Sequence, residues 1–184
     1  RFKADGALID RNSVSLLAQA GGANQRVELS NCTIARNALT APVAFVVENQ
    51  SAPGADRGFS MGHSIYWQPG SPMLPASGIQ IERVRYNIVS SLAGVSSGDT
   101  LFNRTSNPLF IDGDNGDFRL QAASLGIDTA PSRDGFTRDG LPREVDIVGV
   151  DNTAGTLWGG GPRDMGAYEV AGGALFRVFS DGFE

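Results

Sequence analysis

The segment RFKADGALIDRN, residues 1–12, is followed by a segment of the same pattern, RVELSNCTIARN, residues 26–37. The two align at a constant offset of 25 residues, which places Asn12 over Asn37. Repeats with periods of about 20–50 residues are typical of solenoid proteins, in which each repeat packs on the next. The sequence therefore predicts a stacked architecture.

Two looser copies extend the repeat. Phe59 to Tyr66 matches the second segment at an offset of 32 residues from Val27, and Ile79 to Val89 forms a fourth copy. In that fourth copy we expect Tyr86 to Val89 to be the second strand. The lengths between copies vary, as loops on a solenoid do.

The pattern within one period favours short strands. Val27 and Leu29 alternate, Asn31 interrupts the alternation, and Thr33 and Ile34 resume it. No helical 3.6-residue pattern lies between these runs, so the helical repeat classes are excluded, and leucine-rich repeats would need Leu at fixed offsets. A parallel β-helix is the remaining solenoid.

Two consequences follow from the shared coil positions. Ile9, Val27 and Ile34 are expected to point into one continuous core. Asn12 and Asn37 are expected to stack and hydrogen-bond as a ladder.

Composition excludes several classes of function. The formal net charge is −5 and Lys3 is the only lysine, so no basic stripe exists for nucleic acid. No apolar run approaches the ~18 residues of a spanning helix, so no membrane span is expected. A single cysteine, Cys32, excludes an intrachain disulfide.

Beyond residue 106 the repeat stops and five short motifs follow in order. The motifs are Pro108-Leu109-Phe110, Asn115-Gly116-Asp117-Phe118-Arg119-Leu120, Ser124-Leu125-Gly126-Ile127-Asp128, Asp139-Gly140-Leu141-Pro142-Arg143 and Asp164-Met165-Gly166-Ala167-Tyr168-Glu169. In this order they resemble the C-terminal region of secreted bacterial right-handed β-helix proteins that carry a choice-of-anchor Q domain. One departure is Leu125-Gly126, where that family prefers Pro-Ala.

The resemblance, together with the repeat, predicts an all-β fold: the last coils of a right-handed parallel β-helix with an irregular C-terminal β cap. We expect terminal coils at 1–106, a capping module at 107–170 and a tail at 171–184. The resemblance also implies an extracellular or outer-surface location in a Gram-negative bacterium. The tail ends in Asp181-Gly182-Phe183-Glu184 and is interpreted either as a sorting signal or as residues that pack on the last coil.

An acidic stretch offers a candidate metal site. Asp112, Asp114 and Asp117 alternate with Gly and Asn, a pattern that can present oxygen ligands to Ca²⁺. The EF-hand's terminal Glu has no counterpart, because residue 123 is Ala. Asn115-Gly116 is also a strong hairpin signal. We expect a turn and no cofactor, with calcium as the alternative.

Catalytic candidates are few, and no catalytic residue is assigned. Asp139, Asp164 and Glu169 could pair for glycoside hydrolysis, or they could satisfy Arg143 in a structural ion pair. His63, the only histidine, aligns with Asn31 and is expected to be a hydrogen-bonding corner residue; no Gly-x-Ser-x-Gly motif accompanies it. Cys32 is expected to be a packed small residue.

Tyr66 and Trp67 adjoin a loop rich in Gly and Pro. Their rings could stack on a sugar, or they could cover apolar surface. The chain is therefore predicted to be a noncatalytic surface or secreted module, adhesin-like or polymer-binding, whose partner is an extracellular polysaccharide or cell-surface component. The alternative is a polysaccharide lyase or glycoside hydrolase.

Residues 1–12 already match the repeat pattern. This predicts that the chain is the C-terminal piece of a longer β-helix. It also predicts self-association through the open N-terminal coil.

Overall fold

The computed structural model describes residues 2–14, 18–20, 26–40, 44–47, 58–73, 81–93, 95, 102–127, 129 and 164–168. Within these ranges the chain is all-β, apart from one 3-10 turn at Gly113–Asn115, and most strands pair in parallel. No helix that the structure describes is long and apolar enough to cross a membrane.

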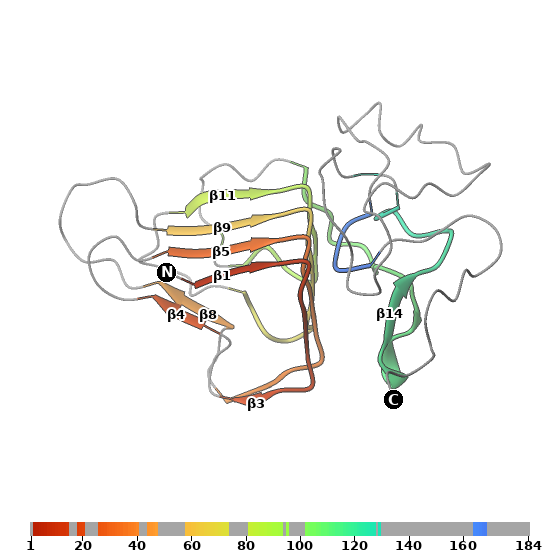
Figure 1. Ribbon diagram of the computed structural model, residues 1–184, viewed down its shortest axis with the longest axis horizontal. Coiled ribbons are helices and arrows are strands. Elements are labelled where there is room, and N and C mark those ends of the chain that lie inside the picture. Colours follow the sequence, from red (N-terminus) through yellow and green to blue (C-terminus); the bar gives the residue numbers. More distant parts are fainter. Residues whose placement is uncertain are drawn as a thin grey trace, which may run out of the picture.

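The first sheet stacks four strands from successive repeats (Figure 1). Its order is β1-β5-β9-β11, and all neighbours are parallel. Phe2 pairs with Val27 and Val27 pairs with Phe59, so the predicted offsets of 25 and 32 residues are confirmed as strand registers. The strands are β1 (Phe2–Asp5), β5 (Arg26–Ser30), β9 (Gly58–Gly62) and β11 (Ile81–Arg85).

The second sheet repeats this stacking after a short turn. Its order is β12-β10-β6-β2, again parallel, and Ile9 pairs with Ile34, which pairs with Tyr66. The fourth-copy strand predicted at Tyr86 to Val89 is shorter in the structure, Ile88–Val89. The strands are β2 (Leu8–Asp10), β6 (Thr33–Ala35), β10 (Ile65–Trp67) and β12 (Ile88–Val89).

Two further strand pairs continue the first two repeats. β3 (Ser13–Val14) pairs with β7 (Ala38–Leu39), and β4 (Ala18–Ala20) pairs with β8 (Phe45–Val47), both in parallel. The first two repeats thus contribute four strands each, in the same order.

The corner between the first two sheets is made by residues in the left-handed conformation. Asn31, His63 and Tyr86 have φ of 50°, 52° and 58°, and Gly6 has φ of 62°. A positive φ is uncommon outside glycine. Because it recurs at the same corner in successive repeats, the corner conformation is part of the repeating structure. His63 and Asn31 share this position, as their alignment predicted.

The core lies between the strands of the first two sheets and β8. Val27, Ile34, Phe45, Phe59 and Tyr66 are fully buried there. Ile9 is half-buried and packs against the same cluster, so the prediction that Ile9, Val27 and Ile34 share one core is confirmed.

Tyr66 reaches across this core with its hydroxyl, which donates to the Ser71 carbonyl at 2.8 Å. Burial raises the pKa of the Tyr66 hydroxyl to about 12.

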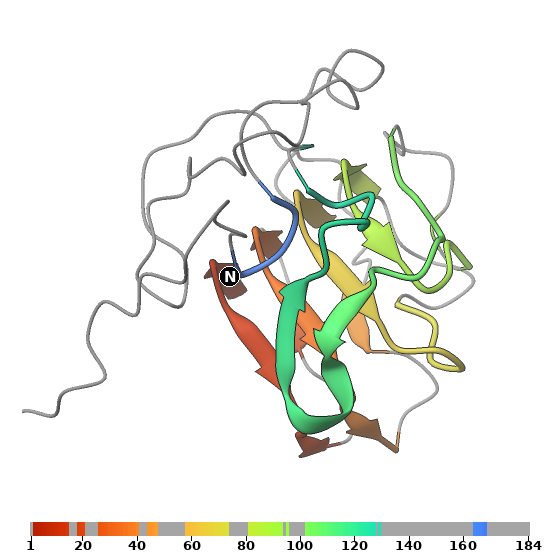
Figure 2. The ribbon, with the colours of Figure 1, turned by 90° about the vertical axis from the view of Figure 1, so that its right-hand side faces the viewer.

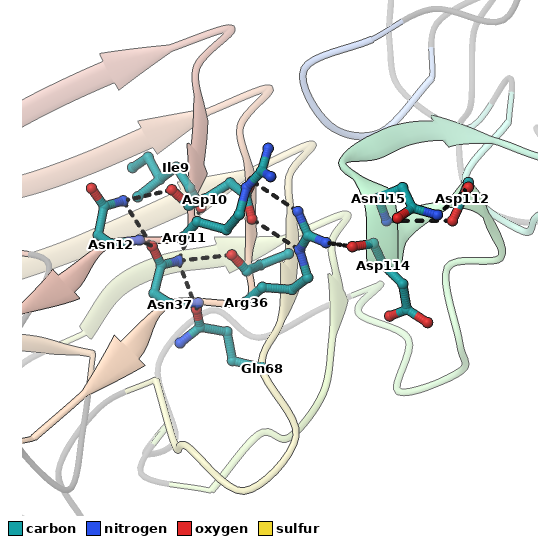
Figure 3. Close-up of polar contacts among 11 residues, drawn as sticks. Ile9, Asp10, Arg11, Asn12, Arg36, Asn37, Gln68, Asp112, Asp114 and Asn115 are labelled. Carbon is teal, nitrogen blue, oxygen red and sulfur yellow. Dashed lines mark hydrogen bonds and ion pairs between the residues drawn. The ribbon is translucent and has the colours of Figure 1, made fainter.

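The predicted asparagine ladder is present (Figure 3). Asn12 Nδ2 donates to Asn37 Oδ1 at 2.8 Å, and Asn37 Nδ2 donates to Gln68 Oε1 at 2.7 Å. Each amide satisfies polar groups of the repeat beside it, as buried polar groups require.

A second ladder lies just after the corner residues, and sequence reasoning missed it. The Ser64 N–H donates to Asn87 Oδ1 at 3.0 Å, and Asn87 Nδ2 donates to Asn103 Oδ1 at 2.9 Å. Cys32 occupies the first position of this series. It is fully buried, as expected, and its thiol donates to the Ser30 carbonyl.

Candidate functional site

A two-stranded hairpin faces the outer side of the second sheet (Figure 2). β13 (Phe110–Asp112) and β14 (Asp117–Leu120) pair in antiparallel fashion around the 3-10 turn. Gly116 ends the turn at φ 97°, a conformation that favours glycine. Asp112 accepts from the side-chain amide of Asn115 at 2.8 Å, so the turn expected from Asn-Gly is confirmed.

An apolar cluster holds this C-terminal part against the sheet. Ile65 and Ile88, on strands β10 and β12, pack with Leu120, Ile127 and Met165. Each of these side chains is at most 4% exposed. The second sheet is therefore covered on both faces, which explains why all three residues of β6 are buried.

The segment Asp164–Tyr168 crosses the same outer face. Consecutive backbone N–H groups of this segment donate hydrogen bonds to the residues beneath it. Met165 N donates to the Gly126 carbonyl, and Gly166 N donates to the His63 carbonyl at 2.9 Å. Ala167 N donates to Thr33 Oγ1 at 3.0 Å. Gly166 approaches so closely that a Cβ there would lie 2.6 Å from Thr33 Oγ1.

Arg36 joins the turn of the hairpin to the stacked strands (Figure 3). Its Nε and Nη2 donate to the two oxygens of Asp10 at 3.1 and 3.0 Å. Its Nη1 donates to the carbonyl oxygen of Asp114, and its guanidinium lies 4.8 Å from the centre of the Phe118 ring. Asp10 also accepts from Arg11 Nε at 2.8 Å.

A groove of about 330 Å³ runs between the second sheet and the hairpin. Trp67 and Arg36 line it from the sheet, and Asp112, Asp114 and Gln121 line it from the hairpin and its flank. Its volume lies at the lower end of the range for small-ligand sites, and the groove is open, with both polar and apolar walls. Gln121 is exposed and Trp67 is half-buried, so the groove combines a ring with accessible polar groups.

Trp67 and Tyr66, the two predicted sugar-binding aromatics, are placed differently. Trp67 lines the groove, whereas Tyr66 is fully buried in the core. Tyr66 therefore cannot stack on a ligand, and this part of the sequence-based interpretation is corrected. The physical reason is the alternation of a strand, which sends adjacent side chains to opposite faces.

The three carboxylates proposed as weak metal candidates lie in the hairpin. Asp112 and Asp114 line the groove, and Asp117 is bound by Arg119, whose Nε donates to it at 2.8 Å. That hydrogen bond holds the pKa of the Asp117 carboxyl below its usual range. Within the described part of the chain, no group of three His, Cys, Asp or Glu residues is arranged to hold a metal ion.

The remaining candidates lie elsewhere. His63 stacks on Tyr86, with ring centres 5.4 Å apart, at the corner between the first two sheets. Asp164, the first residue of the crossing segment, is 1% exposed. Asp139, Arg143 and Glu169 lie outside the described residues, as does the tail at 171–184.

Sequence reasoning missed Arg36, Asn107 and Gln121 as residues of the groove. Arg36 carried one signal, since it aligns with Arg11 at the coil position before the Asn ladder. Asn107 and Gln121 flank the hairpin motifs and carried no signal. The sequence matches no protein-family model, no curated protein and no solved structure.

Proposed function

We propose that this chain forms the last coils of a right-handed parallel β-helix and serves as a noncatalytic module that binds an extracellular polysaccharide. The finer fold assignment is supported by three features. The strand registers follow the repeat, the corner conformation recurs at each level, and two polar ladders join neighbouring repeats. Parallel strands joined by crossovers are right-handed in about 98% of cases.

The observation that carries the binding function is the groove beside Trp67. An aromatic ring supplies a flat apolar face for a pyranose, and nearby polar groups can receive its hydroxyls. The polar groups here are the amides of Asn107 and Gln121, both exposed. Stacked repeats supply the rigid lateral surface that suits an extended polymer.

The location is proposed on the resemblance to the choice-of-anchor Q family, which implies secretion and display at the outer surface of a Gram-negative cell. Self-association through the first repeat stays a prediction. Within the described residues β1 and β2 each pair with one strand, β5 and β6. Sedimentation that shows only monomer at every accessible concentration would contradict it.

Binding is tested by titrating soluble polysaccharides into the protein and recording tryptophan fluorescence and heat. We expect Trp67→Ala to lower the affinity at least about tenfold, equal to ~1.4 kcal/mol, because central aromatic residues dominate most binding sites. Trp67→Phe should retain much of the affinity. Leu125→Ala is the matched control, since Leu125 is 44% exposed and does not line the groove.

The rival function is a polysaccharide lyase or glycoside hydrolase. Asp112 and Asp114 would be its carboxylates, because both line the groove. Incubation with polyuronates, followed by absorbance of unsaturated products, tests the lyase, and a reducing-sugar assay tests the hydrolase. Product that disappears in Asp114→Asn would replace the binding function with the enzymatic one.

A further inference from the structure

We infer that the ligand of this groove is a polysaccharide without carboxylates and that the groove disfavours polyuronates; this rests on the proposed binding function. The charges around the groove carry the argument. One guanidinium, of Arg36, and two carboxylates, of Asp112 and Asp114, line it. The lining is therefore net negative.

Arg36 offers little charge to an acidic ligand. All three of its nitrogens already donate within the protein, two of them to Asp10 and one to the Asp114 carbonyl. The Asp10 side chain is only 6% exposed and binds both Arg36 and Arg11, so these three residues together carry one positive charge. With the carboxylates of Asp112 and Asp114 added, the charge around the groove is still net negative. A uronate would have to displace the bidentate contact of Arg36 with Asp10, whose fork geometry matches a carboxylate well.

The two groove carboxylates repel an acidic ligand. Asp112 and Asp114 are both exposed, and the amide of Asn115 fixes the orientation of Asp112. Like charges at about 4 Å in water repel by ~1 kcal/mol, which lowers affinity about fivefold for each close pair. Successive uronates along a chain would meet this repulsion at both positions.

The remaining groove contacts suit neutral sugars. Trp67 supplies a ring face, and Asn107 and Gln121 supply exposed amides that are uncharged at every pH. Asn107 Oδ1 accepts from Leu109 N and Gln121 Nε2 donates to the Phe110 carbonyl, so the Asn107 amide nitrogen and the Gln121 amide oxygen are the groups offered to a sugar. Amide groups can donate and accept, which matches sugar hydroxyls. The groove thus has partners for hydroxyls and no unpaired cation for carboxylates in its described lining.

The test measures the binding of one panel of polymers to the whole chain. The neutral probes are dextran, galactan, xylan and mannan, and the anionic probes are polygalacturonate and alginate. We expect a neutral polymer to bind more tightly than either anionic one. Its affinity should change less than twofold between 0.1 and 1 M NaCl, where the Debye length falls from ~10 to ~3 Å.

Charge-removing variants sharpen the test. Asp114→Asn should raise the affinity for polygalacturonate about fivefold relative to the affinity for the neutral polymer. Asp112→Asn should act in the same direction. Asp117→Asn is the matched control, since Asp117 lies in the same hairpin, is paired with Arg119 and does not line the groove.

The outcomes separate this inference from the function on which it rests. If no polymer of any charge binds, the proposed function fails. If polygalacturonate or alginate binds more tightly than every neutral polymer, and Trp67→Ala removes that binding, the function stands and the inference is overturned.

Discussion

The two faces of the sheet β12-β10-β6-β2 are covered by different means. On its inner face, Ile34 and Tyr66 pack among side chains one repeat away. On its outer face, Ile65 and Ile88 pack against residues of the non-repeating C-terminal part, and Ala167 N reaches Thr33 across 134 residues. The inner face is thus closed by neighbours in the repeat and the outer face by distant chain.

This difference bears on how each region is specified. Contacts on the inner face recur with a fixed register, so one correctly aligned pair implies the next. Contacts on the outer face occur once, and each depends on the conformation of a particular turn. We therefore expect the two regions to respond differently to substitution, even though they share one sheet.

The largest expected effect is in the inner core. Ile34→Ala removes a fully buried side chain and should lower the free energy of unfolding by ~2–5 kcal/mol. Ile65→Ala makes the same substitution on the outer face. Ile65 precedes Tyr66, the residue of β10 that pairs with Ile34. Chemical denaturation followed by far-UV circular dichroism and tryptophan fluorescence measures both variants.

If the two faces belong to one cooperative unit, both variants shift a single transition. If Ile65→Ala instead gives two transitions, one of which keeps the original midpoint in far-UV circular dichroism, the C-terminal part unfolds separately. An Ile34→Ala variant with an unchanged midpoint would contradict the core itself.

The second prediction concerns the ionisation of Tyr66, a single residue of the inner core. The pKa of Tyr66 is raised from its ordinary value of 10.0 to about 12, so its contribution to stability is complete below pH 10 and is lost as pH rises toward 12. The loss amounts to ~2.7 kcal/mol at most, because each pKa unit equals 1.36 kcal/mol.

Urea denaturation of the native chain and of Tyr66→Phe between pH 8 and 11.5 checks this. The variant loses the hydrogen bond to Ser71 but has no hydroxyl to ionise, so its stability should fall less steeply above pH 10. Parallel curves for the two proteins would show that Tyr66 does not titrate with this shift.

The repeat made much of the inner region predictable from sequence. The alignment of residues 1–12 with 26–37 anticipated the register of Ile9 with Ile34 and the ladder from Asn12 to Asn37. The same alignment also indicates which of the two adjacent aromatic residues is buried, an indication that the sequence-based prediction did not use. Since Tyr66 aligns with the inward-facing Ile34, the same register places Tyr66 inside and leaves Trp67 outside.

The outer region was predictable only locally. Asn115-Gly116 indicated the hairpin turn, which is set by short-range backbone preferences. Which face the hairpin would contact depended on packing between Leu120 and the outward side chains Ile65 and Ile88, and no periodicity encodes that contact. The groove exists only because of this docking, so its residues could not be assembled from sequence.

A third prediction concerns that docking. Gly166 has φ 101°, and an added Cβ would lie 2.6 Å from Thr33 Oγ1. Gly166→Ala should lower the free energy of unfolding by ~1–3 kcal/mol, since both the backbone conformation and the close approach oppose it. Thermal unfolding of Gly166→Ala, Thr33→Ala and the double variant measures this.

Thr33→Ala removes the clashing oxygen but also the acceptor for Ala167 N. The two substitutions should therefore be less than additive in the double variant. Strict additivity would indicate that Gly166 and Thr33 are not in contact and that the segment Asp164–Tyr168 lies elsewhere.

The smallest expected effect lies within the hairpin. Arg119 binds Asp117 through its Nε at 2.8 Å, yet the two side chains are 39% and 27% exposed, so solvent screens the pair. Asp117→Asn should cost only ~0.2–1 kcal/mol near neutral pH. Because the hydrogen bond from Arg119 lowers the pKa of Asp117, its contribution is present above the ordinary Asp value and is lost as pH falls through the lowered one.

Urea denaturation of the native chain and Asp117→Asn between pH 7 and 2.5 measures this contribution, and the difference between them should shrink toward the acid end. A small effect fits a hairpin that is held mainly by the apolar cluster around Leu120 and by the contacts of Arg36. A loss as large as that of Ile65→Ala would instead mean that the local ion pair determines whether the hairpin docks, and the groove would then depend on the charge state of Asp117.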